Sequence, residues 1–130
     1  MPPSRRPDPR AALFALTLAA TLAYAALPLT ARAAPDPTQP WRAAAARGDG
    51  PALADLTALP FLYEGRSLDR AQFIARAVPG LFTPAVRRCL QRAPAEAEDG
   101  ALVLWCKPYG FYLRPVDGAW RLADFVADLP

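Results

Sequence analysis

The chain has 130 residues, of which 53% are hydrophobic and 21% charged, with 15 Lys and Arg against 12 Asp and Glu. Four of the Arg and one Asp fall in residues 1–33, so residues 34–130 carry 11 basic and 11 acidic side chains and no net charge. Proteins that bind nucleic acid or anionic membranes usually show clustered Lys and Arg. The balance therefore argues against both partners.

Residues 1–33 have the layout of a secretory signal peptide. A basic segment with Arg5, Arg6 and Arg10 precedes the apolar run 11–27, and small residues follow at 31–33. We expect cleavage before Ala34, which would leave no membrane span and place the mature chain in the periplasm or outside the cell.

Two alternatives concern this leader. The apolar run of 17 residues is near the lower limit for a membrane span, so a retained anchor is the first. The Arg5-Arg6 pair suggests a twin-arginine signal, but Pro7-Asp8-Pro9 follows where such signals carry apolar residues.

The remaining 97 residues are enough for one domain with its own core. Residues 34–40 are rich in Pro and predict an extended tether, so the folded domain is expected over 41–130.

The first half of this domain is expected to be mainly helical. Helices are predicted over 41–47 and 51–59, the second with Pro51 at its first position. Residues 60–65 predict a short strand that Gly65 ends.

A third helix follows, with a capping box formed by Asp69 and Gln72. The residues expected on its buried face are Phe73, Ile74, Ala77 and Val78. Pro79-Gly80 ends or kinks it, and a fourth helix begins near Pro84.

Three basic residues, Arg87, Arg88 and Arg92, lie at the end of the fourth helix. They can form an anion site, but cations there also complement the negative end of the helix dipole, and we favour that interpretation. The acidic segment 93–100 predicts an exposed connection.

Residues 101–127 contain three runs of β-branched and aromatic residues, separated by Lys107-Pro108 and Asp117-Gly118, which predicts an antiparallel meander. A two-residue turn at Asp117-Gly118 would place Arg114 opposite Arg121, and facing like charges are unfavourable. We therefore predict a three-residue loop, 116–118, with a bulge that sets Arg114 opposite Trp120 and Tyr112 opposite Leu122.

The two cysteines, Cys89 and Cys106, are 17 residues apart. In a small exported domain an even number of cysteines favours a disulfide, and a loop of that size would stabilise the fold by about 3 kcal/mol. Two buried thiols are the alternative.

Three segments (59–66, 68–73 and 81–87) and the closing hairpin 116–122 resemble small secreted bacterial domains of the NTF2-like, or cystatin-like, superfamily. The resemblance covers about residues 41–127. It implies an α+β fold in which N-terminal helices pack on a curved antiparallel sheet to form a cone that can enclose a pocket. Relatives include isomerases, hydrolases and proteins that only bind or dimerise, so the fold does not choose a function.

An enzyme resembling ketosteroid isomerase would need a buried carboxylate base with a Tyr donor. The candidates are Glu64 or Asp124 with Tyr63, Tyr109 or Tyr112. Asp124 is expected on a strand face with Trp120, Leu122 and Val126, and its simplest interpretation is an exposed residue at the rim.

The chain contains no His, which removes the commonest acid–base group, His-based metal sites and His-activated nucleophiles. We expect no cofactor and no metal.

In the meander, Phe111 and Leu113 are expected on one face of the sheet and Tyr112 on the other, and Leu104 and Trp105 also diverge. Both faces would then be apolar, so the second needs a cover: a small apolar ligand, a partner protein or a homodimer. We predict a non-catalytic exported domain that binds such a ligand or partner, with an isomerase- or hydrolase-like enzyme using Asp124 as the alternative. Tyr63, Tyr112 and Asp124 are the candidate ligand-binding residues.

Overall fold

The computed structural model describes residues 34–127. The predicted signal peptide, residues 1–33, lies outside this range. The helices are α2 (Gln39–Arg47), α3 (Gly50–Asp55), α4 (Arg70–Gln72), the π-helical segment η2 (Phe73–Ala77), α5 (Val78–Leu81) and α6 (Pro84–Leu90). The strands are β1 (Phe61–Tyr63), β2 (Arg66–Leu68), β3 (Glu96–Glu98), β4 (Ala101–Cys106), β5 (Tyr109–Val116) and β6 (Ala119–Ala127). Among these residues, no helix combines the length and apolar character that crossing a bilayer requires.

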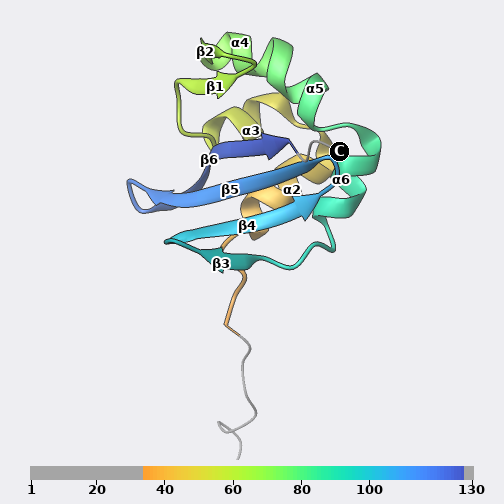
Figure 1. Ribbon diagram of the computed structural model, residues 1–130, viewed down its shortest axis with the longest axis vertical. Helices are drawn as coiled ribbons and strands as arrows, with labels where there is room; N and C mark the ends of the chain where they lie inside the picture. Colours follow the sequence, from red (N-terminus) through yellow and green to blue (C-terminus); the bar gives the residue numbers. More distant parts are fainter. Residues whose placement is uncertain (1–33, 128–130) are drawn as a thin grey trace, which may run out of the picture. The chain divides into compact units, whose positions relative to one another are not determined.

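The predicted α+β class is confirmed: the structure has a layer of helices packed on an antiparallel sheet. Strands β3 to β6 form an antiparallel sheet in sequence order, and helices pack against one of its faces (Figure 1). The sheet is open, because β3 and β6 are edge strands that do not pair with each other. Strands β1 and β2 form a separate hairpin.

Two segments that we expected to be irregular are strands. The acidic connection 93–100 contains β3, whose Glu96 and Glu98 pair with Val103 and Ala101 of β4. Residues 66–68, expected to lead into a helix, form β2. Strand β2 follows the Glu64-Gly65 turn and β3 precedes the Asp99-Gly100 turn. In both cases pairing with the neighbouring strand across a tight turn decides the conformation of a short polar segment.

Three hairpins have a two-residue turn that ends in Gly. Glu64-Gly65, Asp99-Gly100 and Asp117-Gly118 all have positive φ at both positions, between 48° and 79°. This is the type I′ geometry, whose twist matches that of the flanking strands and which Asp-Gly favours.

The predicted three-residue loop at 116–118 is therefore wrong. Val116 pairs with Ala119 and Arg114 faces Arg121. The like charges are tolerated because the side chains diverge: Arg114 donates to the carbonyl of Asp99 at 2.9 Å and Arg121 to that of Asp55 at 3.2 Å.

The β5–β6 hairpin does contain a bulge, but it lies opposite Tyr112 and Leu113 and not at the turn. Tyr112 pairs with Asp124 but Leu113 pairs with Leu122, which leaves Ala123 as an extra residue in β6. Such a bulge reverses the alternation of side chains beyond it. Leu122 is consequently buried while Asp124 is exposed, so the predicted shared face of Asp124 and Leu122 is wrong.

Local sequence signals set the helix boundaries. The capping box of Asp69 and Gln72 is present as predicted, and Thr83 caps α6 with Pro84 in its first turn. Helix α2 begins at Gln39, and Thr38 is fully buried, so residues 36–40 belong to the folded unit and not to a tether.

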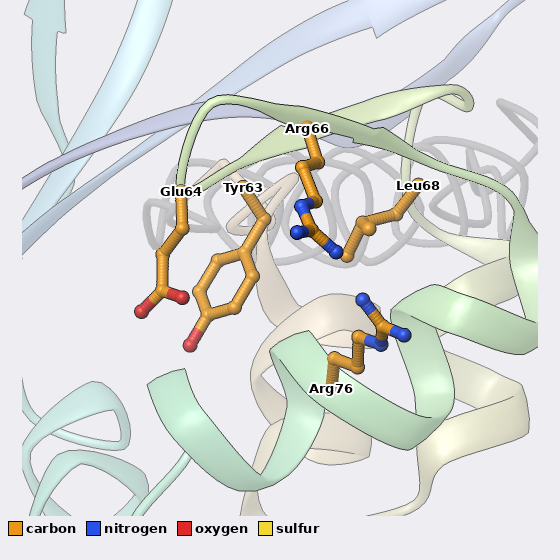
Figure 2. A pocket seen from close by; sticks show the side chains of 5 residues that line it. All are labelled: Tyr63, Glu64, Arg66, Leu68 and Arg76. Atoms are coloured by element: carbon orange, nitrogen blue, oxygen red, sulfur yellow. The ribbon is translucent and has the colours of Figure 1, made fainter.

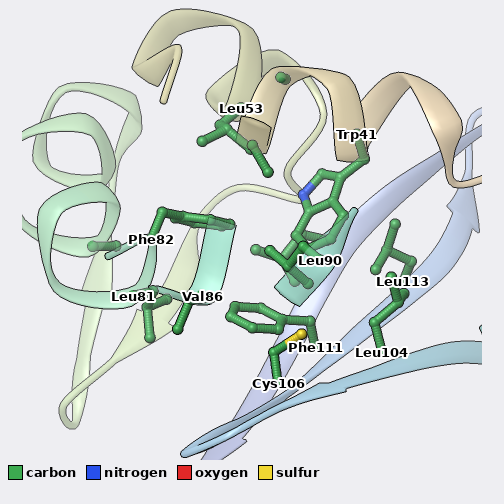
Figure 3. Packing of buried hydrophobic residues seen from close by; sticks show 14 of the residues in the cluster. Trp41, Leu53, Leu81, Phe82, Val86, Leu90, Leu104, Cys106, Phe111 and Leu113 are labelled. Atoms are coloured by element: carbon green, nitrogen blue, oxygen red, sulfur yellow. The ribbon is translucent and has the colours of Figure 1, made fainter. Parts of the chain in front are cut away.

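Aliphatic and aromatic side chains fill the space between the sheet and the helices (Figure 3). Phe111 of β5 is fully buried, with the rings of Trp41 and Phe82 at 5.6 and 5.5 Å. A second group, centred on Phe61 and Phe125, joins the β1–β2 hairpin to the sheet. Tyr109 lies between the two groups, at 5.9 Å from Phe111 and 5.8 Å from Phe125.

A buried arginine connects the beginning of α2 to the end of α6. Arg42 donates to the hydroxyl of Thr38 at 2.8 Å and to the carbonyls of Leu90 and Ala93 at 2.8 and 2.6 Å. It also forms an ion pair with Asp36 at 3.0 Å. Burial opposes ionisation of Asp36, but hydrogen bonds from Thr38 and the charge of Arg42 outweigh it and lower the pKa of the carboxyl.

Replacing Arg42 by Met tests this connection. The variant leaves the Leu90 and Ala93 carbonyls and the Thr38 hydroxyl without their donor, so we expect the free energy of unfolding to fall by about 2–4 kcal/mol. Arg47→Met on the same helix is the control, because its only ion pair is exposed and 3.7 Å long; it should change stability by about 0.5 kcal/mol or less. Urea unfolding of both variants measures the difference, and equal losses would contradict the prediction.

The predicted disulfide is present and links α6 to β4. Cys89 and Cys106 are bonded, with their Cα atoms 5.7 Å apart, inside the range that a disulfide requires. Cys106 is buried in the core and Cys89 is half-buried. The bond therefore fixes the end of a short helix to the sheet.

The double variant Cys89→Ser, Cys106→Ser is expected to lose about 3 kcal/mol of stability, the value for a loop of this size. The separation of 17 residues sets that estimate. Denaturant unfolding with and without reductant measures it. Reductant should lower the stability of the wild type and leave that of the double variant unchanged. Destabilisation of both proteins would show that reductant does not act through the Cys89–Cys106 bond.

Candidate functional site

The first candidate site is a cavity of about 510 Å3 between the β1–β2 hairpin and the η2 helix, which we call the arginine cavity. Figure 2 shows its lining: Tyr63, Glu64, Arg66, Leu68 and Arg76. The hairpin supplies four of these residues and η2 supplies Arg76. In the figure, the guanidinium groups of Arg66 and Arg76 extend into the same space from opposite walls.

Neither arginine has an acidic partner within the described residues. The three ion pairs there use Arg42, Arg47 and Arg70. Glu64 lines the same cavity, and in Figure 2 the ring of Tyr63 lies between it and the two guanidinium groups. The walls therefore carry two positive charges and one negative charge.

The position of Tyr63 depends on a glycine. A Cβ atom on Gly80 would lie 2.2 Å from the Tyr63 hydroxyl oxygen, so only Gly allows the phenol to rest against α5. Burial raises the pKa of the Tyr63 phenol, and the negative charge of Glu64 raises it further. The phenol is therefore protonated at neutral pH and can donate a hydrogen bond.

The other two predicted site residues, Tyr112 and Asp124, face each other across β5 and β6. They lie on the outer face of the sheet, defined by Val103, Trp105 and Tyr112, whereas Leu104, Phe111 and Leu113 point to the core. The predicted divergence of Phe111 and Leu113 from Tyr112, and of Leu104 from Trp105, is confirmed. The structure thus brings Tyr112 and Asp124 together and separates them from Tyr63.

This pair does not form an enclosed acid–base site. Asp124 is exposed, and its carboxylate accepts a hydrogen bond from the backbone N–H of Phe125 at 2.8 Å. Tyr112 is within 3.5 Å of Glu98, and partial desolvation and that carboxylate raise its pKa. In residues 34–127 no three Cys, Asp or Glu side chains are placed to hold a metal ion.

The centre of the outer face is Trp105, which is 45% exposed. A Cβ on Gly110 would lie 2.5 Å from the Trp105 ring, so the indole rests directly on the glycine backbone of β5. The rings of Trp105 and Tyr112 form a T-shaped pair with their centroids 6.4 Å apart. Val126, which pairs with Gly110, is 38% exposed.

The outer face is not uniformly apolar, which corrects our expectation. Glu96 and Glu98 on β3 and Asp124 on β6 flank the aromatic centre, and Arg114 and Arg121 lie at one end of it. Beyond Trp105, Arg88 and Arg92 line a hollow of about 400 Å3 together with that ring. Because the bulge at Ala123 shifts the alternation of side chains in β6, a strict period of two did not predict on which face Asp124 lies.

Sequence reasoning identified Tyr63 but missed Arg66, Arg76 and Gly80. Arg66 follows a turn whose register was not predicted, and Arg76 was hidden in a helix assigned from its apolar face alone. The available signal was the Tyr-Glu-Gly-Arg hairpin turn, which would have placed Tyr63 and Arg66 as cross-strand neighbours.

Comparisons with protein-family models, with curated proteins and with solved structures gave no match for this chain. The NTF2-like resemblance therefore stays a prediction.

Gly110→Ala tests the packing of the Trp105 ring on Gly110. A strand glycine replaced by Ala gains about 0.5–1 kcal/mol from reduced chain entropy, but displacing a packed ring costs about 1–3 kcal/mol. We expect a net loss near 1 kcal/mol and red-shifted, more readily quenched tryptophan fluorescence. The same change in a Trp105→Phe background should leave the fluorescence unaltered; a red shift there would assign it to another tryptophan.

Proposed function

We propose that this chain is a non-catalytic exported domain that binds a partner through the outer face of its sheet, and that the partner is a second copy of the chain. The observation that carries the proposal is the rigid, half-exposed Trp105, fixed over Gly110 beside Tyr112 and Val126. Trp and Tyr held in this way lose little entropy on binding and are enriched at the energetic centres of protein interfaces.

The arrangement of charges favours a second copy. Acidic residues flank the aromatic centre on the edge strands, and arginines lie at its two ends. Four strands span about 14 Å across, and the four steps along the strand from Gly110 to Arg114 also span about 14 Å. Two faces packed with their strands crossed near 90° therefore place the acids of each copy over the arginines of the other.

A purely apolar small ligand is less well supported. The arginine cavity is lined by two arginines, and covering their charges with an apolar molecule would remove their hydration without replacing it. The enzyme alternative lacks an enclosed carboxylate, because Asp124 is exposed.

Two features support export. The Cys89–Cys106 disulfide is of the kind that forms and persists in oxidising compartments. The leader-like sequence of residues 1–33 predicts the same destination. The NTF2-like resemblance is compatible with this proposal, since helices packed on an open antiparallel sheet are part of the fold it implies.

Trp105→Glu should separate the two copies. Loss of a central Trp weakens an interface by at least about 2 kcal/mol, or roughly 30-fold in the dissociation constant. Sedimentation or light scattering over a concentration series should show a wild-type mass that rises from one chain to two, and a variant that stays at one.

Leu62→Glu is the matched control, because Leu62 is 58% exposed and lies on the β1–β2 hairpin. It should dimerise like the wild type. A wild-type protein that remains a single chain throughout the series, or equal effects of the two substitutions, would reject the proposal.

A further inference from the structure

The arginine cavity carries an inference that is independent of the outer face. Arg66 and Arg76 approach each other without an acidic partner in the described residues, and like charges that share a cavity repel. An anion between them would turn this repulsion into two charge-assisted interactions. We propose that the arginine cavity binds a small organic monocarboxylate, held between Arg66 and Arg76 with its apolar part against Tyr63 and Leu68.

The cavity has the size of a ligand site. Its volume of about 510 Å3 lies within the range of about 300–1,000 Å3 that small-molecule sites occupy. Leu68 is fully buried and forms an apolar floor, and the Tyr63 ring forms a wall. Arginine forks match a carboxylate in bidentate geometry and also stack on aromatic rings, so both parts of the ligand have complementary surfaces.

The charge of the walls selects the class of anion. Two arginines and Glu64 give a net charge of +1, which one carboxylate neutralises. A phosphate dianion would leave an excess negative charge beside Glu64.

The backbone around the cavity is also specialised. Arg76 belongs to the π-helical segment η2, and such segments occur often at functional sites because they redirect side chains. Gly80 allows the Tyr63 hydroxyl to reach α5. The π-helical segment and Gly80 thus place Arg76 and Tyr63 in the cavity walls through two separate backbone features.

The test is a calorimetric titration of the purified full chain with benzoate, with benzyl alcohol as the neutral analogue and inorganic phosphate as the competing anion. We expect saturable benzoate binding, no binding of benzyl alcohol, and weaker binding of phosphate. Arg66→Gln and Arg76→Gln should each weaken benzoate binding about tenfold or more. Both residues are exposed, so circular dichroism should report an unchanged fold.

Arg47→Gln is the matched control, since Arg47 is an exposed arginine on α2, outside both the arginine cavity and the proposed dimer face, and it should bind benzoate like the wild type. Gly80→Ala provides a second variant, which should weaken binding by displacing the Tyr63 hydroxyl while both arginines remain. No saturable benzoate binding, equal binding of benzyl alcohol, tighter binding of phosphate, or unchanged affinity in both Gln variants would each overturn the proposal.

Discussion

The packing of Phe111 against Trp41 and Phe82 is the contact on which the rest of the fold depends. Phe111 lies in the middle of the inner face, and its two partners come from α2 and from the segment before α6. Burial of an aromatic ring contributes about 2–3 kcal/mol, and edge or offset contacts add about 0.5–1.5 kcal/mol. No other group of rings joins the sheet to both ends of the helical layer in the described residues.

Two further links, the hydrogen bonds of Arg42 and the Cys89–Cys106 disulfide, hold the helical layer together and against the sheet. Arg42 satisfies carbonyls at the end of α6, which is too short to be stable alone, and the disulfide ties that helix to β4. Together they hold α6 against the sheet while leaving the outer face uncovered by any helix of the described residues (Figure 1). The exposed position of Trp105 follows from this one-sided arrangement.

The two proposed binding surfaces use different physical means. The outer face presents a rigid aromatic centre with charges around it, which suits a flat protein surface. The arginine cavity presents concentrated positive charge over a small apolar floor, which suits a compact anion. The outer face is built on the four-stranded sheet, and the arginine cavity on the β1–β2 hairpin and η2.

The sequence by itself determined the α+β class, the capping box at Asp69, the disulfide and the alternation of Phe111 and Leu113 with Tyr112 between the two faces of the sheet. Each of these depends on short-range chemistry: turn residues, hydrogen bonds within one helical turn, thiol number, or a period of two along a strand. Only the tertiary structure decided the Arg114–Arg121 register, the bulge at Ala123, the role of Arg42 and the meeting of Arg66 with Arg76. These depend on where remote carbonyls and neighbouring elements lie, because a diverging guanidinium can remove a repulsion that pairwise reasoning along the chain treats as decisive.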